Sequence, residues 1–130
     1  MSTDPPAKVL VVEDTEDTAD FVKLLLSAEG YDVHVAYNGE DGLRAVRDFA
    51  PDVMLVDIQL PGIDGLELTR RVRADPATAD AAIIVFTAFV QEEDRRRAFD
   101  AGCDGFIPKP FPVQTLRDEI QRLLDARRSR

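Results

Sequence analysis

Apolar residues along this chain fall into short, nearly continuous runs, and between these runs apolar positions recur every three or four residues. The short runs are typical of strands, and the periodic stretches are typical of helices that bury one face. Strands are predicted at residues 8–12, 32–37, 53–57, 82–86 and 105–107. Helices are predicted at residues 15–29, 39–48, 64–74 and 90–101 and over the segment from Val113 to Leu124. Strand and helix therefore alternate five times.

The makeup of the runs predicts how the strands are arranged. The first, third and fourth runs are continuously aliphatic, as expected of parallel strands that helices cover on both faces. In the second run Val33, Val35 and Tyr37 alternate with His34 and Ala36, which favours a place nearer an edge. The fifth run is short and precedes a proline, which cannot donate to a ladder and also favours an edge. We expect one α/β sheet of parallel strands with right-handed crossovers, with too few units for an eight-stranded barrel.

Two of the predicted helices carry a specific expectation. The spacing in the helix at 15–29 predicts these buried positions: Phe21, Leu24, Leu25 and Ala28. Glu16 and Asp17 lie in its first turn, where carboxylates interact favourably with the helix dipole. The helix at 90–101 has only a thin apolar face, made of Val90, Ala98, Phe99 and Ala101. A weakly packed helix of this kind is a hypothetical movable element.

Composition limits the class of protein. With 130 residues, 45% apolar and 32% charged, the chain is expected to form one folded domain over about residues 8–125 with short flexible ends. Its net charge of −9 argues against binding to nucleic acid or to anionic membranes. The basic residues at 126–130 are interpreted as the solvated end of the last helix.

Few residues of the chain suit nucleophilic or zinc chemistry. A single cysteine, Cys103, excludes an internal disulfide and a cysteine-based zinc site. The single histidine, His34, lies in an alternating strand and is interpreted as a surface residue.

The first residues lack the pattern of a signal peptide, and no apolar run has the length of a membrane span. A cytoplasmic location is therefore expected.

Polar residues follow four of the five predicted strands at or next to their carboxyl ends. Glu13 and Asp14 follow the first strand, Asp57 ends the third, Thr87 follows the fourth, and Lys109 comes shortly after the fifth. Functional groups of open parallel sheets collect beyond these carboxyl ends. We therefore expect three carboxylates, a hydroxyl and an amine to converge on one edge of the sheet.

Such a cluster points to phosphoryl chemistry with a divalent ion. Neighbouring carboxylates raise one another's pKa unless a cation compensates them, and oxygen ligands without histidine or cysteine indicate Mg²⁺ or Mn²⁺. Lys109 and the hydroxyl of Thr87 could bind phosphoryl oxygens. No GxxxxGK or GxGxxG loop is present to hold a nucleotide. The phosphoryl group is therefore expected to arrive on a donor and to move to an aspartate as an acyl phosphate.

Four segments in order resemble one known family. They are VVED at 11–14, LVDIQLPGIDG at 55–65, FTA at 86–88 and AGCDGFIPKPF at 101–111. Over about residues 8–125 the chain resembles the receiver domain of bacterial two-component response regulators. The resemblance implies a flavodoxin-like (βα)5 fold with strand order 2-1-3-4-5 and helices on both faces.

The resemblance also implies roles for the residues at the strand ends. Asp57 would be the phosphoacceptor and a metal ligand. Asp14 would bind Mg²⁺ directly, Glu13 mainly through water, and Gln59 through its backbone carbonyl. Lys109 would bridge to the carboxylate and then to a phosphoryl oxygen.

Further implications concern switching and partners. Thr87 would shift toward the phosphoryl group, and Phe106 would occupy an aromatic switch position that turns inward. The peptide bond between Lys109 and Pro110 would be cis. The donor would be a phosphohistidine on a histidine kinase or a phosphotransfer protein, and the output a protein partner, with the receiver a monomer or a phosphorylation-dependent dimer. The protein would promote its own phosphorylation and dephosphorylation without being an enzyme in the usual sense.

Other interpretations remain open. The chain could be cut from a hybrid histidine kinase or a multidomain regulator, or it could be a receiver-like interaction module that is never phosphorylated. A phosphatase with an aspartate nucleophile would carry a second aspartate where this chain has Gln59. A flavin binder is disfavoured, because Asp14 and Asp57 would repel the flavin phosphate in the absence of a metal.

Overall fold

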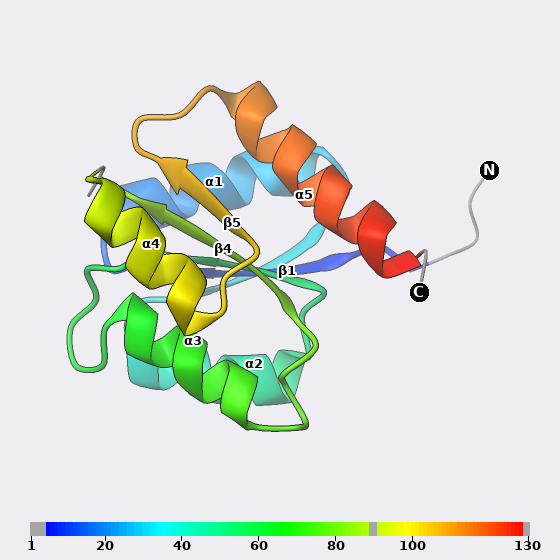
Figure 1. The fold of residues 1–130 in the computed structure, drawn as a ribbon. Helices are drawn as coiled ribbons and strands as arrows, with labels where there is room; N and C mark the ends of the chain where they lie inside the picture. The colour runs from blue at the N-terminus through cyan, green and yellow to red at the C-terminus, as the bar shows by residue number, and fades with distance from the viewer. Residues whose placement is uncertain (1–4, 89–90, 129–130) are drawn as a thin grey trace.

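A parallel sheet of five strands lies at the centre of the structure, a computed structural model that describes residues 5–88 and 91–128 (Figure 1). The strands are β1 (Lys8–Val12), β2 (Asp32–Ala36), β3 (Val53–Val56), β4 (Ala82–Thr87) and β5 (Gly105–Pro108). Their order is β2-β1-β3-β4-β5, so the predicted order and both predicted edge strands are confirmed.

Each strand is followed by a helix. The helices are α1 (Glu16–Ala28), α2 (Gly39–Phe49), α3 (Gly65–Ala74), α4 (Glu92–Ala101) and α5 (Val113–Arg128). Their bounds differ from the sequence-based expectation by a few residues at most, apart from α5, which extends past Leu124 to Arg128. Val90, predicted to belong to the α4 helix, lies outside the described residues. Within the part of the chain that the structure describes, no helix combines the length and the apolar character needed to cross a membrane.

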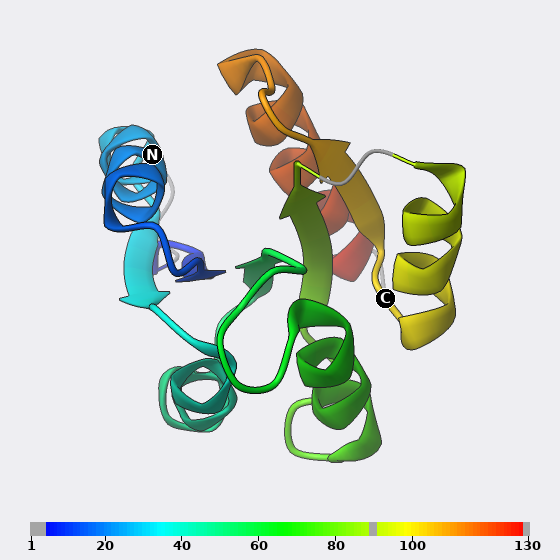
Figure 2. The ribbon, with the colours of Figure 1, turned by 90° about the vertical axis from the view of Figure 1, so that its left-hand side faces the viewer.

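The side chains of the strands alternate between two cores, because successive residues of a strand point to opposite faces. Leu10, Met54 and Ile83 belong to the core that α2, α3 and α4 cover, whereas their neighbours Val9 and Val53 belong to the core under α1 and α5. Figure 2 shows α1 and α5 on one side of the sheet and the other three helices on the opposite side. Two-sided burial explains why the central runs are continuously aliphatic.

The predicted buried face of α1 was wrong. Phe21 and Leu24 are 55% and 69% exposed. The fully buried residues of this helix are Ala19, Val22 and Leu26. The segment carries two apolar stripes, both with helical spacing, and the pattern alone does not tell which stripe faces the sheet. The structure buries the stripe that contacts Val9, Val11 and other residues of that core.

Two smaller expectations also need correction. The predicted alternation holds for Val33 and His34 but not for the last two residues of the predicted strand: Ala36 is buried, and Tyr37, which lies beyond the end of β2, is 41% exposed. The reason is that β2, although an edge strand, is covered on both faces, and Ala36 belongs to the core on the α2 side. In α4 the buried residues are Ala98 and Ala101, whereas Phe99 is 39% exposed under the guanidinium group of Arg95. The apolar face of α4 is thus even thinner than predicted.

The corrected face of α1 can be tested with two leucines of the same helix. Replacing the buried Leu26 by alanine leaves a cavity and should lower the free energy of unfolding by about 2–4 kcal/mol. Replacing the exposed Leu24 by alanine should change it by less than about 0.5 kcal/mol. Urea unfolding of the two variants measures both values, and equal destabilisation would contradict this assignment of the buried face.

Candidate functional site

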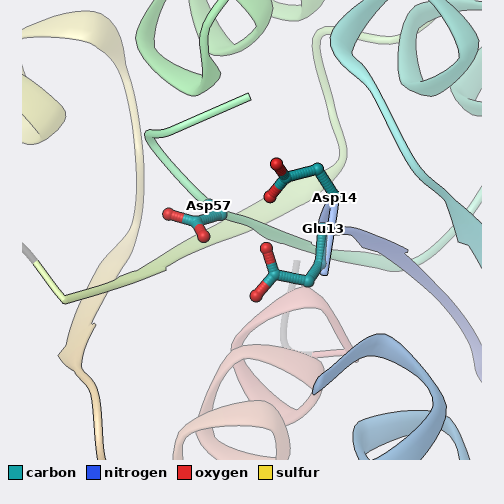
Figure 3. A group of neighbouring side chains, drawn as sticks. All are labelled: Glu13, Asp14 and Asp57. Carbon is teal, nitrogen blue, oxygen red and sulfur yellow. The ribbon is translucent and has the colours of Figure 1, made fainter. Parts of the chain in front are cut away.

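Three carboxylates meet at the carboxyl edge of the sheet. Glu13 and Asp14 directly follow β1, Asp57 directly follows β3, and each offers an oxygen within 4.8 Å of the others' (Figure 3). The expectation that residues 13, 14 and 57 converge is therefore met in space. No histidine or cysteine takes part in the group.

Backbone hydrogen bonds hold these residues in place by extending the ladders past the strand ends. The amide of Glu13 donates to the carbonyl of Ala36 (3.0 Å), and the amide of Asp57 donates to the carbonyl of Val12 (3.1 Å). On the other side of the site the amide of Lys109 donates to the carbonyl of Thr87 (2.8 Å). The site therefore rests on rigid sheet backbone, although its residues come from distant parts of the sequence.

Lys109 joins two of the carboxylates. Its Nζ donates to Oε1 of Glu13 at 2.5 Å and to Oδ2 of Asp57 at 2.9 Å. The Lys109–Pro110 bond is cis, as the resemblance implied. Burial lowers the pKa of Lys109, but the hydrogen bonds that it donates to Glu13 and Asp57 outweigh burial, so its pKa lies above the usual value. The ammonium group therefore stays charged and offsets part of the repulsion between the two carboxylates.

The buried carboxylate of Glu13 is only partly satisfied. Glu13 is fully buried, and its Oε2 has no hydrogen-bond partner among the described residues. Burial, followed by the proximity of Asp57, raises the pKa of Glu13 to about 7, although Lys109 acts in the opposite direction. An orphaned buried carboxylate oxygen beside two further carboxylates fits a divalent cation with a preference for oxygen ligands.

The carboxylates differ in their access to solvent. Asp14 is exposed, Asp57 is 6% exposed, and Glu13 is closed off. The amide of Gln59 donates to Oδ1 of Asp57 (3.2 Å), so the segment after Asp57 bends back over its side chain. Asp57 thus has a fixed orientation at the edge of the site, whereas Asp14 is free to take an incoming ligand.

Thr87 and Phe106 lie near the site on neighbouring strands. Thr87, the last residue of β4, is buried and pairs with Pro108, and Phe106 of β5 pairs with Val85. Phe106 is half-buried against the core on the α4 side. This location suits the switch role implied for both residues, which stays a prediction.

Sequence reasoning missed an aromatic ring that lies against the lysine and a second ring that packs on the first. Nζ of Lys109 lies 4.6 Å from the centroid of the buried ring of Phe86, a cation–π distance. The ring of Phe86 contacts that of Phe111 edge-on, with centroids 6.2 Å apart. Both residues stand in the quoted motifs, but nothing in the sequence showed that the Phe86 ring would lie under the ammonium group or that Phe111 would pack against that ring.

Comparison with known proteins agrees with this geometry. The family model described as the response regulator receiver domain matches residues 9–121. The chain belongs to this family. Its receiver domain is 38% identical over 117 residues to the response regulator ArlR of Staphylococcus saprophyticus, covering 90% of this chain and 52% of the relative. It is 33% identical over 117 residues to RpaA of Synechocystis, described as a DNA-binding dual master transcriptional regulator, covering 90% of this chain and 48% of RpaA.

The chain thus spans about half the length of these curated relatives. Because one of them is described as DNA-binding, the expectation that nucleic acid is not a partner stays a prediction. The receiver domain also resembles a solved structure, that of the receiver domain of the sensor histidine kinase PA1611 of Pseudomonas aeruginosa, with a TM-score of 0.86 and 29% identity. The match covers 92% of this chain and 98% of that one, which is described with a magnesium ion coordinated in its active-site cleft.

The raised pKa of Glu13 predicts a pH-dependent stability of the metal-free protein. Between pH 4.5 and about 7 the folded state retains a proton on Glu13 that the unfolded state releases, so the stability contributed by this residue falls as pH rises. Glu13→Gln removes the ionisable group and should be more stable than wild type by about 1–3 kcal/mol above pH 7. The gain should shrink toward pH 4.5.

Urea unfolding across this range with a chelator present measures the difference. Glu93→Gln, which changes an exposed carboxylate on α4 paired with Arg96, controls for the loss of one negative charge. A gain for Glu13→Gln that does not vary with pH would contradict the assignment.

Proposed function

We propose that Asp57 of this receiver domain accepts a phosphoryl group from a phosphohistidine on a histidine kinase or a phosphotransfer protein. The observation that carries the proposal is the bridge from Lys109 to Glu13 and Asp57 at the edge of the sheet. This arrangement places the ammonium group of Lys109 beside the carboxylate of Asp57, which is nearly buried and has a fixed orientation. It leaves the exposed Asp14 next to both.

A divalent ion, Mg²⁺ by preference and Mn²⁺ as an alternative, would be held directly by the carboxylates of Asp14 and Asp57 and by the carbonyl of Gln59, and by Glu13 mainly through water. The carboxylates and the orphaned Oε2 of Glu13 support this ligand set. The bound ion would supply positive charge that offsets the repulsion between an anionic phosphoryl group and the acidic cluster.

The residues of the chain would act mainly by position and charge. A carboxylate oxygen of Asp57 forms a bond to phosphorus while the phosphorus–nitrogen bond of the donor breaks. The imidazole of the donor keeps the electron pair of that bond and takes up a proton from solvent. Lys109, already 2.9 Å from Oδ2 of Asp57, would then pair with a phosphoryl oxygen. Hydrolysis of the acyl phosphate later resets the domain, so the protein is a phosphoacceptor that assists its own chemistry.

We further propose that phosphorylation switches the surface around α4. Thr87 would move toward the phosphoryl group, and Phe106 would turn further into the core that it already contacts. The buried contacts of α4 are limited to two alanines among its described side chains, so a movement of this helix costs little free energy. Hydrogen exchange of α4 should differ between the phosphorylated and the unmodified protein, and identical exchange would contradict this part of the proposal.

The domain over about residues 8–125 would signal through a downstream protein partner, as a monomer or as a dimer formed on phosphorylation. It could work alone, or as a module of a hybrid kinase or of a larger regulator. A receiver-like module that is never phosphorylated is the less supported alternative, because the acidic residues and the lysine that the chemistry needs are assembled together.

Incubation with Mg²⁺ and a small acyl-phosphate donor tests the proposal. The wild-type protein should gain the mass of one phosphoryl group, and Asp57→Asn, which keeps the shape of the side chain but lacks the nucleophilic carboxylate, should gain none. Intact-mass spectrometry measures the adduct. Asp64→Asn, which changes the exposed residue that caps α3, is a matched control and should be modified like wild type. An adduct that persists in Asp57→Asn would overturn the proposal.

A further inference from the structure

The first turn of α2 contacts the segment that follows Asp57. We call residues 58–64, between β3 and α3, the site loop. Oε1 of Glu40, the second residue of α2, accepts a hydrogen bond from the backbone amide of Ile63 at 3.1 Å. A carboxylate that accepts from a backbone amide forms a charge-assisted bond, stronger than the usual neutral one. The tip of the site loop is therefore tied to a helix that lies outside the acidic cluster.

Two glycines allow this close contact. Gly62 has a φ of +78°, and a methyl group on it would lie 2.4 Å from both carboxylate oxygens of Glu40. A methyl group on Gly39 would lie 2.3 Å from the carbonyl oxygen of Ile63. The carboxylate of Glu40 thus rests on the backbone of the loop itself. A larger residue at Gly39 would push the helix and the loop apart, and a larger residue at Gly62 would displace the carboxylate.

The site loop also contains groups that belong to the acidic site. Its base is fixed by the bond from the amide of Gln59 to Asp57 and by the bond from the amide of Gly65 to the carbonyl of Ile58 (2.9 Å). Ile58 and Leu60 anchor it in the core, whereas Gln59 between them is exposed. The position of the Gln59 carbonyl relative to the carboxylates therefore depends on how both ends of this short loop are held.

We propose that Glu40 is a positioning residue for the metal site: by holding the tip of the site loop it fixes the carbonyl of Gln59 where a divalent ion binds. This inference rests on the proposed function, in which that carbonyl is a ligand. Without the Glu40 contact the loop must be ordered when the ion binds, and the ordering costs affinity. Groups that hydrogen-bond directly to metal ligands change metal affinity by about 10- to 100-fold, and Glu40, which contacts Ile63 rather than a ligand, should have a smaller effect of the same kind.

A purely electrostatic role must be separated from positioning, because Glu40 also adds a negative charge on the same side of the domain. Glu40→Ala removes both the charge and the acceptor. Glu40→Gln removes the charge but keeps a carbonyl oxygen that can accept from Ile63. Gly62→Ala keeps the charge and displaces the carboxylate. Glu93→Ala removes a first-turn carboxylate of α4 that binds only Arg96 among the hydrogen bonds of the described residues, and serves as the control.

The experiment uses the whole chain and two readouts. Hydrogen exchange of the Ile63 amide in the metal-free protein measures the contact, and titration of metal-free protein with magnesium chloride, followed by amide chemical shifts, measures affinity. Glu40→Ala and Gly62→Ala should raise the exchange rate about tenfold, the equivalent of one charge-assisted hydrogen bond. They should raise the Kd for Mg²⁺ by about threefold to tenfold. Glu40→Gln keeps a neutral acceptor of about half the strength, so it should raise the exchange rate about threefold and leave the Kd within about twofold of wild type. Glu93→Ala should stay within about twofold of wild type in both readouts.

The contrary outcomes are distinct. If Glu40→Gln raised the Kd for Mg²⁺ as much as Glu40→Ala does, while the Ile63 amide stayed protected from exchange, Glu40 would act through its charge. That result would overturn the positioning role. Faster exchange with an unchanged Kd would overturn the link between the loop and the metal. Either result leaves the proposed function standing, because wild type still binds Mg²⁺. A wild-type protein that binds no Mg²⁺ would overturn the proposed function and this inference together.

Discussion

The repulsion between two buried carboxylates, those of Glu13 and Asp57, is the constraint around which this domain is built. Glu13 and Asp57 would not share the edge of the sheet without a positive partner, and Lys109 supplies one charge by binding both. One lysine does not satisfy Glu13 fully, because Oε2 remains without a partner and its pKa is raised to about 7. The negative charge that Lys109 leaves uncompensated makes the cluster suited to a metal ion, and the ion in turn would offset the repulsion of a phosphoryl group.

The parallel sheet makes this arrangement possible at little cost to stability. Ladder hydrogen bonds run one residue beyond the strands and fix Glu13, Asp57 and Lys109 by their backbones, although 96 residues separate the first from the last. Two continuous cores hold the strands from both faces. The strained electrostatics is therefore confined to one edge, whereas the apolar burial that stabilises the fold lies elsewhere. By contrast, α4 buries only two alanines among its described side chains, and it lies beside β5, the strand that carries Phe106.

Sequence reasoning succeeded where a pattern has one physical meaning. Continuous aliphatic runs gave the parallel sheet, and the rule that strand ends share an edge brought Glu13, Asp14 and Asp57 together correctly. It failed where two patterns compete, as in α1, whose two apolar stripes have equal periodicity. It also missed Glu40, since a contact between a helix start and a loop 23 residues away depends on the backbone shape at Gly62, which no spacing encodes.

The central claim is that the cluster directs a phosphoryl group to one carboxylate among several neighbours. Borohydride reduction converts an aspartyl phosphate to homoserine, and peptide mass spectrometry then identifies the position. After treatment of the wild-type protein with Mg²⁺ and a small acyl-phosphate donor, homoserine should be found at position 57 and at no other carboxylate. Homoserine at position 14, the corresponding reduction product at Glu13, or no reduction product at all would contradict the account.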